Sequence, residues 1–248
     1  FPAGSQGGKS VWRGTPASIS MATDLLKAEK HIICERKYRK MIFEKAKKYN
    51  FRCVFFSEKE PETYGRGLEI LKGTDIILAG AIDFPEGVMS LEEKMKEFEK
   101  MAAMGVPEVD YVLNQKAVES RDYDAIEKEM KTVAKFCKSN NIKDKAIVEM
   151  CKLDGDEEAK KKVCEIALKA KPAYLKTSTG RSWKGADLND VKLMKHILGN
   201  EVKIKAAGGI HNYEEAKAFI EAGASALGAS AGIAIVEGER AWKGTVSK

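Results

Sequence analysis

The strongest constraint on the fold is a repeated alternation of short apolar runs with longer amphipathic stretches along most of the chain. Each run has the length of a β-strand and ends in Gly, Ser, Thr, Asn or Pro, which is typical of buried strands followed by turns. Eight strands are expected in this pattern. They cover residues 22–26, 52–56, 76–82, 109–113, 146–150, 173–175, 202–206 and 224–227.

Helices are expected between these strands, over residues 91–104, 123–139, 156–171, 188–198 and 213–222. Two of them begin with capping residues, Ser90 followed by Glu93 and Asn212 followed by Glu215. Repeats of strand and helix predict parallel strands covered by helices. Eight repeats in 248 residues favour a single (β/α)8 TIM barrel of the α/β class over a doubly wound sheet.

Composition supports one globular domain over residues 21–248, because 44% of the residues are hydrophobic and 32% are charged. Residues 1–20 are rich in Gly, Ser and Pro and show no periodicity, so we expect a flexible N-terminal extension, either native or left over from cloning. Five scattered cysteines without a CxxC pair suggest neither a disulfide framework nor a zinc site. No metal or organic cofactor is predicted.

The net charge of +6 is spread along the helices, which suits either an anionic small molecule or a solvated surface. No basic stretch is interleaved with aromatic residues, so nucleic acid is not an expected partner. No apolar run reaches the roughly 20 residues that cross a bilayer, and no secretory signal is recognisable. We therefore expect a cytoplasmic location without membrane contact, and a homo-oligomer is compatible with the sequence.

Two lysines lie near the ends of neighbouring predicted strands, where a barrel carries its chemistry. Lys176 stands in YLKTSTG and Lys205 in IKAAGGI. Because neighbouring strands lie about 4.8 Å apart, the two ammonium groups can disfavour each other's charge and lower the pKa of one of them. A neutral Lys176 amine would be a nucleophile for Schiff-base and aldol chemistry. The alternative is that both lysines are solvated at strand ends.

Asp110 lies in EVDYVLN, where a period of two places it on one face with Val112 and Asn114. If that face is the barrel interior, Asp110 can hydrogen-bond an ammonium group or a water and move protons. The simpler alternative is a structural carboxylate that pairs with a buried lysine. Strand periodicity alone does not decide between the two roles.

Glycine-containing turns follow the last three predicted strands and suggest an anion site. Backbone N–H groups often converge on a phosphate after strands seven and eight of such barrels, at the start of a short helix. Residues 231–236 could form that helix with Ser230 as its N-cap. The candidate phosphate residues are Gly180, Gly208, Gly209, Gly228 and Ser230. Glycines at such turns also serve simple backbone geometry.

Together, YLKTSTG, KAAGGI and GASAGIAIVEG resemble the deoxyribose-phosphate aldolase family in order and spacing, over about residues 21–237. The resemblance implies a class I aldolase that reversibly cleaves 2-deoxyribose 5-phosphate to acetaldehyde and glyceraldehyde 3-phosphate. It implies that Lys176 forms the Schiff base, Lys205 tunes it and Asp110 relays protons. DFPEG at 83–87 is similar to the family's phenylalanine–proline turn.

The chain departs from the family pattern in its first, second and fifth strand motifs, just before Lys205, and at the C-terminus, where the tyrosine found in many members is missing. The substituted positions are Ala22 and Asp24 in the first motif, Phe55 and Phe56 in the second, Met150 and Cys151 after Glu149 in the fifth, and Lys203. By periodicity, Lys203 should point into the barrel like Lys205. The residues Phe55, Phe56 and Met150 are expected to make the pocket more apolar.

These departures leave two alternatives open. One is a catalytically weakened or inactive barrel that acts as a protein-interaction module, since a fold can host unrelated functions. The other is a Schiff-base aldolase or transaldolase that acts on a different, less hydroxylated phosphosugar.

Overall fold

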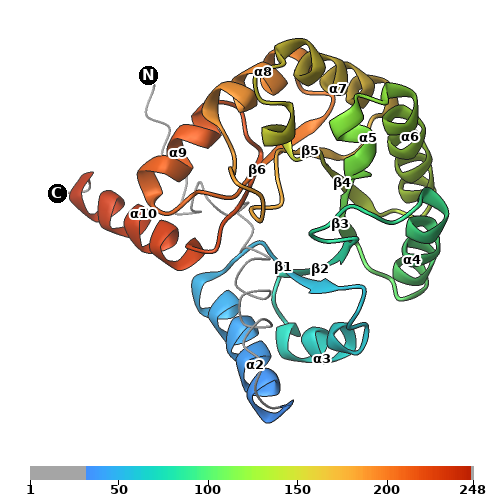
Figure 1. The fold of residues 1–248 in the computed structure, drawn as a ribbon. Helices are drawn as coiled ribbons and strands as arrows, with labels where there is room; N and C mark the ends of the chain where they lie inside the picture. The colour runs from blue at the N-terminus through green and yellow to red at the C-terminus, as the bar shows by residue number, and fades with distance from the viewer. Residues whose placement is uncertain (1–31, 247–248) are drawn as a thin grey trace.

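The computed structural model describes residues 32–246, which form a curled parallel sheet with helices around its outside (Figure 1). Seven strands are hydrogen-bonded in sequence order, so β1 and β7 are the edge strands of the described sheet. The strands are β1 (Cys53–Ser57), β2 (Ile77–Ile82), β3 (Glu108–Val112), β4 (Lys143–Ile147), β5 (Tyr174–Lys176), β6 (Lys203–Ala207) and β7 (Ala226–Gly228).

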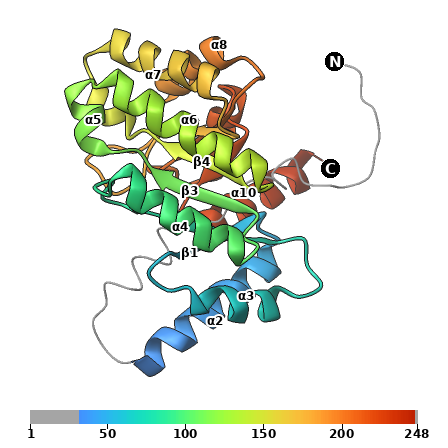
Figure 2. The same ribbon diagram turned by 90° about the vertical axis from the view of Figure 1, so that its right-hand side faces the viewer.

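Helices follow or precede each strand, as expected for parallel strands joined by crossovers. They are α2 (Ile32–Tyr49), α3 (Glu62–Leu71), α4 (Leu91–Ala103), α5 (Gln115–Ser120), α6 (Tyr123–Ser139), α7 (Glu157–Ala170), α8 (Leu188–Leu198), α9 (Tyr213–Glu221) and α10 (Gly232–Val246), with a 3-10 turn η1 (Met150–Leu153). Helices α4 and α6 lie side by side against the outer face of the sheet (Figures 1 and 2). In the part of the chain that the structure describes, no helix is long and apolar enough to span a bilayer.

The α/β class with parallel strands is confirmed, and seven of the eight predicted strands are present with boundaries shifted by one to three residues. The predicted first strand, residues 22–26, and the predicted extension, residues 1–20, lie outside the described residues. All five predicted helices are present, and the capping box of Ser90 and Glu93 forms at the start of α4.

Four helical segments were missing from the sequence prediction or were predicted too short. Helices α2, α3 and α5 were not expected, and α10 continues to Val246 rather than ending at residue 236. In α3, two glycines weaken the helical signal. One of them, Gly67, has a packing reason, because a Cβ at this position would lie 2.4 Å from the Leu78 side chain. Tertiary packing against β2 therefore outweighs the local propensity of α3.

The sheet separates two apolar cores of unequal size. The larger one lies between the strands and the helices, and it includes Leu78, Val109 and Ile204. A small inner cluster occupies the concave face and contains Cys53, Phe55, Ala79, Ala81, Phe84, Val112 and Ile147. Because strand side chains alternate between faces, Asp110 shares the inner face with Val112. The inner face is therefore where polar residues of the strands meet.

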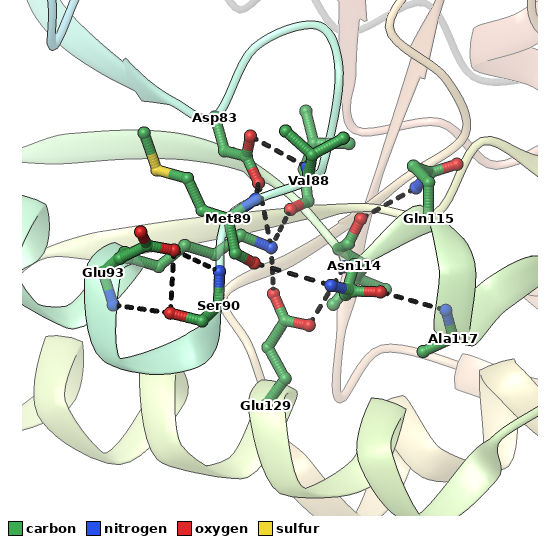
Figure 3. Close-up of polar contacts among 12 residues, drawn as sticks. Asp83, Val88, Met89, Ser90, Glu93, Asn114, Gln115, Ala117 and Glu129 are labelled. Carbon is green, nitrogen blue, oxygen red and sulfur yellow. Dashed lines mark hydrogen bonds and ion pairs between the residues drawn. The ribbon is translucent and has the colours of Figure 1, made fainter.

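A buried lysine ties together the loops that follow β2 and β3. The Nζ atom of Lys94, on α4, donates to Glu129 Oε1 at 2.5 Å and to the Val112 carbonyl at 2.6 Å, and it lies 3.3 Å from Asp83 Oδ2. Asp83 also accepts from the backbone N–H groups of Val88 and Met89 (Figure 3). This network holds Asp83 at the start of the turn that carries Phe84.

Candidate active site

The strand register places the two candidate lysines side by side. Lys176 is the last residue of β5 and pairs directly with Lys205 of β6, so the two side chains leave the sheet on the same face. Their exposed fractions are 2% and 1%. Both side chains nevertheless line one pocket of about 250 Å³. The two amines therefore share a cavity and are almost completely shielded from bulk solvent.

Asp110 of β3 joins the two amines beneath the pocket. Its Oδ2 atom accepts from Lys176 Nζ at 2.8 Å and from Lys205 Nζ at 2.6 Å. The side chain has 0% exposure and does not line the pocket itself. Asp110 can therefore reach a ligand in this pocket only through the two lysines, which narrows the proton-relay role that the sequence suggested.

A third lysine, Lys145 of β4, completes the buried cluster, and its Nζ atom lies 3.0 Å from Asp110 Oδ1. Burial opposes the charge on Asp110, but Lys145, Lys176 and Lys205 outweigh it and hold the pKa of this carboxyl well below its usual range. Asp110 is therefore ionised in the resting protein and lies between three lysine amines.

The pKa of the Lys205 amine falls to about 7, and burial is the main cause. Asp110 opposes this shift, whereas the neighbouring charges of Lys176 and Lys145 add to it. The sequence predicted a lowered pKa for one of the two amines, with a neutral Lys176 as the nucleophile. In the unliganded protein the lowered pKa falls on Lys205. Both amines donate to the same Asp110 oxygen, so a change of charge on Lys205 acts directly next to Lys176.

Lys145 and its second partner, Glu108, were not identified from the sequence. Lys145 Nζ lies 2.9 Å from Glu108 Oε2, and Glu108 also accepts from Arg52. A parity argument could have found Glu108, since it stands two residues before Asp110 on the same strand face. Lys145 was missed because the predicted strand began at residue 146, whereas β4 begins at Lys143.

All five candidate phosphate residues line the same pocket as the lysines: Gly180, Gly208, Gly209, Gly228 and Ser230. Gly208 has φ +84°, and a Cβ there would lie 2.7 Å from Gly180 Cα. Glycine is thus required for the turns after β5 and β6 to touch. Ser230 precedes the N-terminus of α10, which begins at Gly232. Backbone N–H groups and the helix dipole favour an anion at this end of the pocket.

The turn after β5 is held by a buried carboxylate. Glu149, in a left-handed conformation with φ 66°, accepts from the backbone N–H of Thr179 at 3.2 Å and from its hydroxyl group. Burial raises the pKa of Glu149, while Thr179 and the charge of Lys176 oppose the shift. Glu149 thereby fixes the segment between Lys176 and Gly180.

The family departures fall in different surroundings. Phe55 lines the pocket, and its ring centroid lies 4.3 Å from Lys205 Nζ, close enough for a cation–π contact. Phe56 and Met150 belong to the outer core, so the prediction that they line the pocket is wrong. Lys203 starts β6, and its side chain is exposed, with Nζ 5.7 Å from the Tyr174 ring centroid. Lys203 has the inward orientation that strand periodicity predicts, but it is the first residue of the strand, so its side chain reaches solvent.

Among the residues that the structure describes, no three His, Cys, Asp or Glu side chains gather as a group that could hold a metal ion. The polar groups of the pocket are instead amines, hydroxyls, the His211 imidazole and backbone amides. Such a set binds a carbonyl compound through an amine and an anion through N–H groups.

No protein-family model matches the chain. Curated relatives do. A deoxyribose-phosphate aldolase from Lactobacillus acidophilus is 42% identical over 198 residues, which cover 80% of this chain and 81% of the relative. The deoxyribose-phosphate aldolase from Clostridium perfringens is 38% identical over 219 residues, 87% of this chain and 95% of the relative.

Solved structures agree with this relationship. An aldolase named QR15 superposes with a TM-score of 0.78 at 26% identity, covering 96% of this chain and 99% of the other. A tetrameric deoxyribose phosphate aldolase from Aeropyrum pernix has a TM-score of 0.74 at 23% identity over 92% of this chain and 89% of its own, which supports the fold. Sequence identity over four fifths of the chain shows that it belongs to the deoxyribose-phosphate aldolase family.

Proposed function

We propose that this protein is a class I aldolase that reversibly cleaves 2-deoxyribose 5-phosphate to acetaldehyde and glyceraldehyde 3-phosphate. The observation that carries the proposal is that Lys176 and Lys205 share one Asp110 oxygen and both line a pocket that glycine turns also line. The pocket thus offers both an amine and backbone N–H groups.

In the proposed first step, Lys176 passes its proton to Lys205 through the Asp110 oxygen that both amines contact. The neutral Lys176 nitrogen then attacks the aldehyde carbon of the open-chain sugar to give a carbinolamine. The proton now on Lys205 passes to the carbinolamine hydroxyl, which leaves as water, so that an iminium ion forms and Lys205 is neutral again. The distances of 2.8 Å and 2.6 Å mean that this proton transfer needs no rearrangement of the strands.

Carbon–carbon cleavage follows from the electron demand of the iminium ion. A proton leaves the hydroxyl on the third sugar carbon, the bond between the second and third carbons breaks, and its electron pair moves into an enamine. Glyceraldehyde 3-phosphate departs, the enamine takes up a proton, and water releases acetaldehyde from Lys176. Lys205 is placed to accept and return protons during these steps, with Asp110 holding it in position.

The phosphate is proposed to bind where Gly180, Gly208, Gly209 and Gly228 meet Ser230 and the start of α10. The close backbone contact between Gly180 and Gly208 supports this assignment, since a side chain at either position would separate the two turns that line the pocket. A phosphate at this end directs the aldehyde end of the sugar toward the lysines.

We further propose that the sheet closes as an eight-stranded barrel, with residues 22–26 as the additional strand between β1 and β7. The order of the seven described strands and the likeness to QR15 support this closure. A homo-oligomer is also proposed, with support from the tetrameric state of the Aeropyrum pernix aldolase.

A steady-state assay of 2-deoxyribose 5-phosphate cleavage tests the proposal. Turnover of about 1 per second or more, an ordinary enzyme rate, is expected for the wild type and its loss for Lys176→Ala. Absence of turnover, with the fold intact by circular dichroism, would instead favour the interaction-module alternative. A panel of phosphosugars run in parallel distinguishes an aldolase with a different substrate, because that enzyme would cleave another member of the panel faster.

A further inference from the structure

Three charged residues form a continuous network below the reactive lysines, at the amino-terminal end of the strands. We call Arg52, Glu108 and Lys145 the floor network. Arg52 Nη1 donates to Glu108 Oε2 at 2.9 Å, and Lys145 Nζ lies 2.9 Å from the same oxygen. Lys145 also reaches Asp110 Oδ1 at 3.0 Å. The network therefore joins a partly exposed arginine to the carboxylate that contacts both Lys176 and Lys205.

Burial of this network is not explained by packing. Glu108 and Lys145 are each 1% exposed, and the Arg52 side chain is 18% exposed. Removing such charges from water costs several kcal/mol per ion, and apolar residues of similar size often stabilise a core as well or better. None of the three side chains lines the pocket, so they do not contact substrate there.

We infer that Glu108 is a positioning residue for the aldolase reaction. It acts through Lys145 on the charge balance of Asp110, Lys176 and Lys205, and the positive charge of Arg52 partly offsets its effect. The inference rests on the proposed function for the identity of the reaction. Without Glu108, three buried lysines would face the single carboxylate of Asp110. With Glu108, a second carboxylate shares Lys145, so the Asp110 charge remains available to the reactive pair.

The surroundings of Glu108 leave the buried lysine and the arginine as its main partners. Lys143 of β4 lies 3.7 Å from Glu108 Oε1, but its side chain is 57% exposed and water screens it. Burial raises the pKa of the Cys53 thiol to about 11 and also raises that of the Tyr174 hydroxyl, so both neighbours stay neutral near pH 7. Burial opposes the Glu108 charge, yet Lys145 and Arg52 hold its pKa at about 2.

The rings around Lys145 add no charge but favour a cation. Lys145 Nζ lies 5.3 Å from the Phe55 ring centroid and 6.0 Å from that of Tyr174. Asp110 and Glu108 raise the pKa of Lys145 above its ordinary value in spite of its burial. Lys145 therefore stays positively charged. A change of charge at Glu108 then alters the electrostatic balance of the neighbouring groups, Asp110 and the amine pair.

The sign of the effect differs between two variants. Glu108→Gln removes a negative charge, so the amine pair should lose its proton more readily and the acidic limb of the kcat/KM profile should move about 1 pH unit lower, for charges about 10 Å apart. Arg52→Gln removes a positive charge and should move the same limb higher, by a smaller amount because Arg52 is farther away and partly exposed. Lys143→Gln is the matched exposed control and should shift the limb by less than about 0.2 pH unit.

Two measurements on each variant separate the inference from the proposed function. The first is kcat/KM for 2-deoxyribose 5-phosphate against pH. The second is the rate of reductive methylation of Lys176 and Lys205 by formaldehyde and cyanoborohydride against pH, read by peptide mass spectrometry. Methylation reports on the neutral amine whether or not the protein is an aldolase.

Opposite displacements of the methylation midpoint in Glu108→Gln and Arg52→Gln support the inference, even if the wild type does not cleave the sugar and the proposed function fails. An active wild type whose midpoint stays unchanged in both variants, or moves the same way in both, overturns it and leaves the floor network a purely structural feature. If Glu108→Gln does not fold, Arg52→Gln decides alone, since its upward displacement is expected and an unchanged midpoint contradicts the inference.

Discussion

Replacing Lys205 with methionine should slow imine formation at Lys176 by about 10³-fold at pH 7. In the wild type the Lys205 pKa of about 7 means that roughly half of the molecules hold one neutral amine in the pair at pH 7. The reference for the variant is a lysine that contacts a carboxylate and has lost one neighbouring cation. A lysine with the ordinary pKa of about 10.4 is neutral in about one molecule in 2,500 at that pH, and the ratio of the two populations gives the factor.

The assay is single-turnover trapping of acetaldehyde by borohydride, with the rate measured between pH 6 and pH 9. The variant rate should rise about tenfold per pH unit over this range, whereas the wild-type rate should level off above pH 7. Lys203→Met is the control, because Lys203 lies on the same strand with an exposed side chain. A Lys205→Met rate within tenfold of the wild type at pH 7, or a variant profile that also levels off near pH 7, would refute the reasoning.

Three further substitutions test the electrostatics and the loop geometry. Lys94→Met leaves the buried carboxylates of Asp83 and Glu129 without their cation and should lower the free energy of unfolding, measured in urea, by about 3–5 kcal/mol. Lys96→Met, on the exposed face of α4, should change it by less than about 0.5 kcal/mol. Equal effects would show that the buried Lys94 network does not stabilise the fold. Burial raises the pKa of Asp144 from 3.8 to about 6, so this carboxyl costs the folded state stability as the pH rises from about 4 to about 6, and the loss stays constant above that range. Asp144→Asn should therefore gain about 3 kcal/mol of stability relative to the wild type between pH 4 and pH 7.5, and parallel stability curves would show that the carboxyl ionises freely. Gly208→Ala and Gly73→Ala impose similar backbone strain, at φ +84° and +79°, but only the new Cβ at position 208 would clash with other backbone atoms. The loss of kcat/KM should therefore be roughly 10²-fold larger for Gly208→Ala. Similar losses in the two variants would show that Gly208 does not shape the phosphate site.

The proximity of Lys176 and Lys205 was predictable from the sequence because two local signals agree. Lys176 and Lys205 each stand near the end of an apolar run before a small-residue turn, and parallel strands end at one edge of a sheet. The glycine turns were predictable for the same reason. Each turn directly follows a parallel strand, so all of them lie at the carboxyl-terminal edge of the sheet, in the order of their strands.

The floor network was not predictable, because it depends on register between strands. Glu108 and Lys145 lie close together because β3 pairs with β4. The sequence prediction began the fourth of these strands at residue 146 instead of Lys143, so Lys145 was not considered. The sequence expectations for Phe56 and Lys203 were wrong for different reasons, although both residues follow strand parity. Phe56 follows Phe55 and must face the outer core, while Lys203 faces inward at the open end of the strand, where solvent is available.

The most direct test of the account is to locate the lysine that acetaldehyde and borohydride modify at neutral pH. At low acetaldehyde concentration, the amine that attacks the carbonyl becomes ethylated and is identified by peptide mapping. The account predicts an ethyl group on Lys176, lost when Asp110 is replaced by leucine. An ethyl group on Lys205 with Lys176 unmodified, or scattered over exposed lysines, would contradict it.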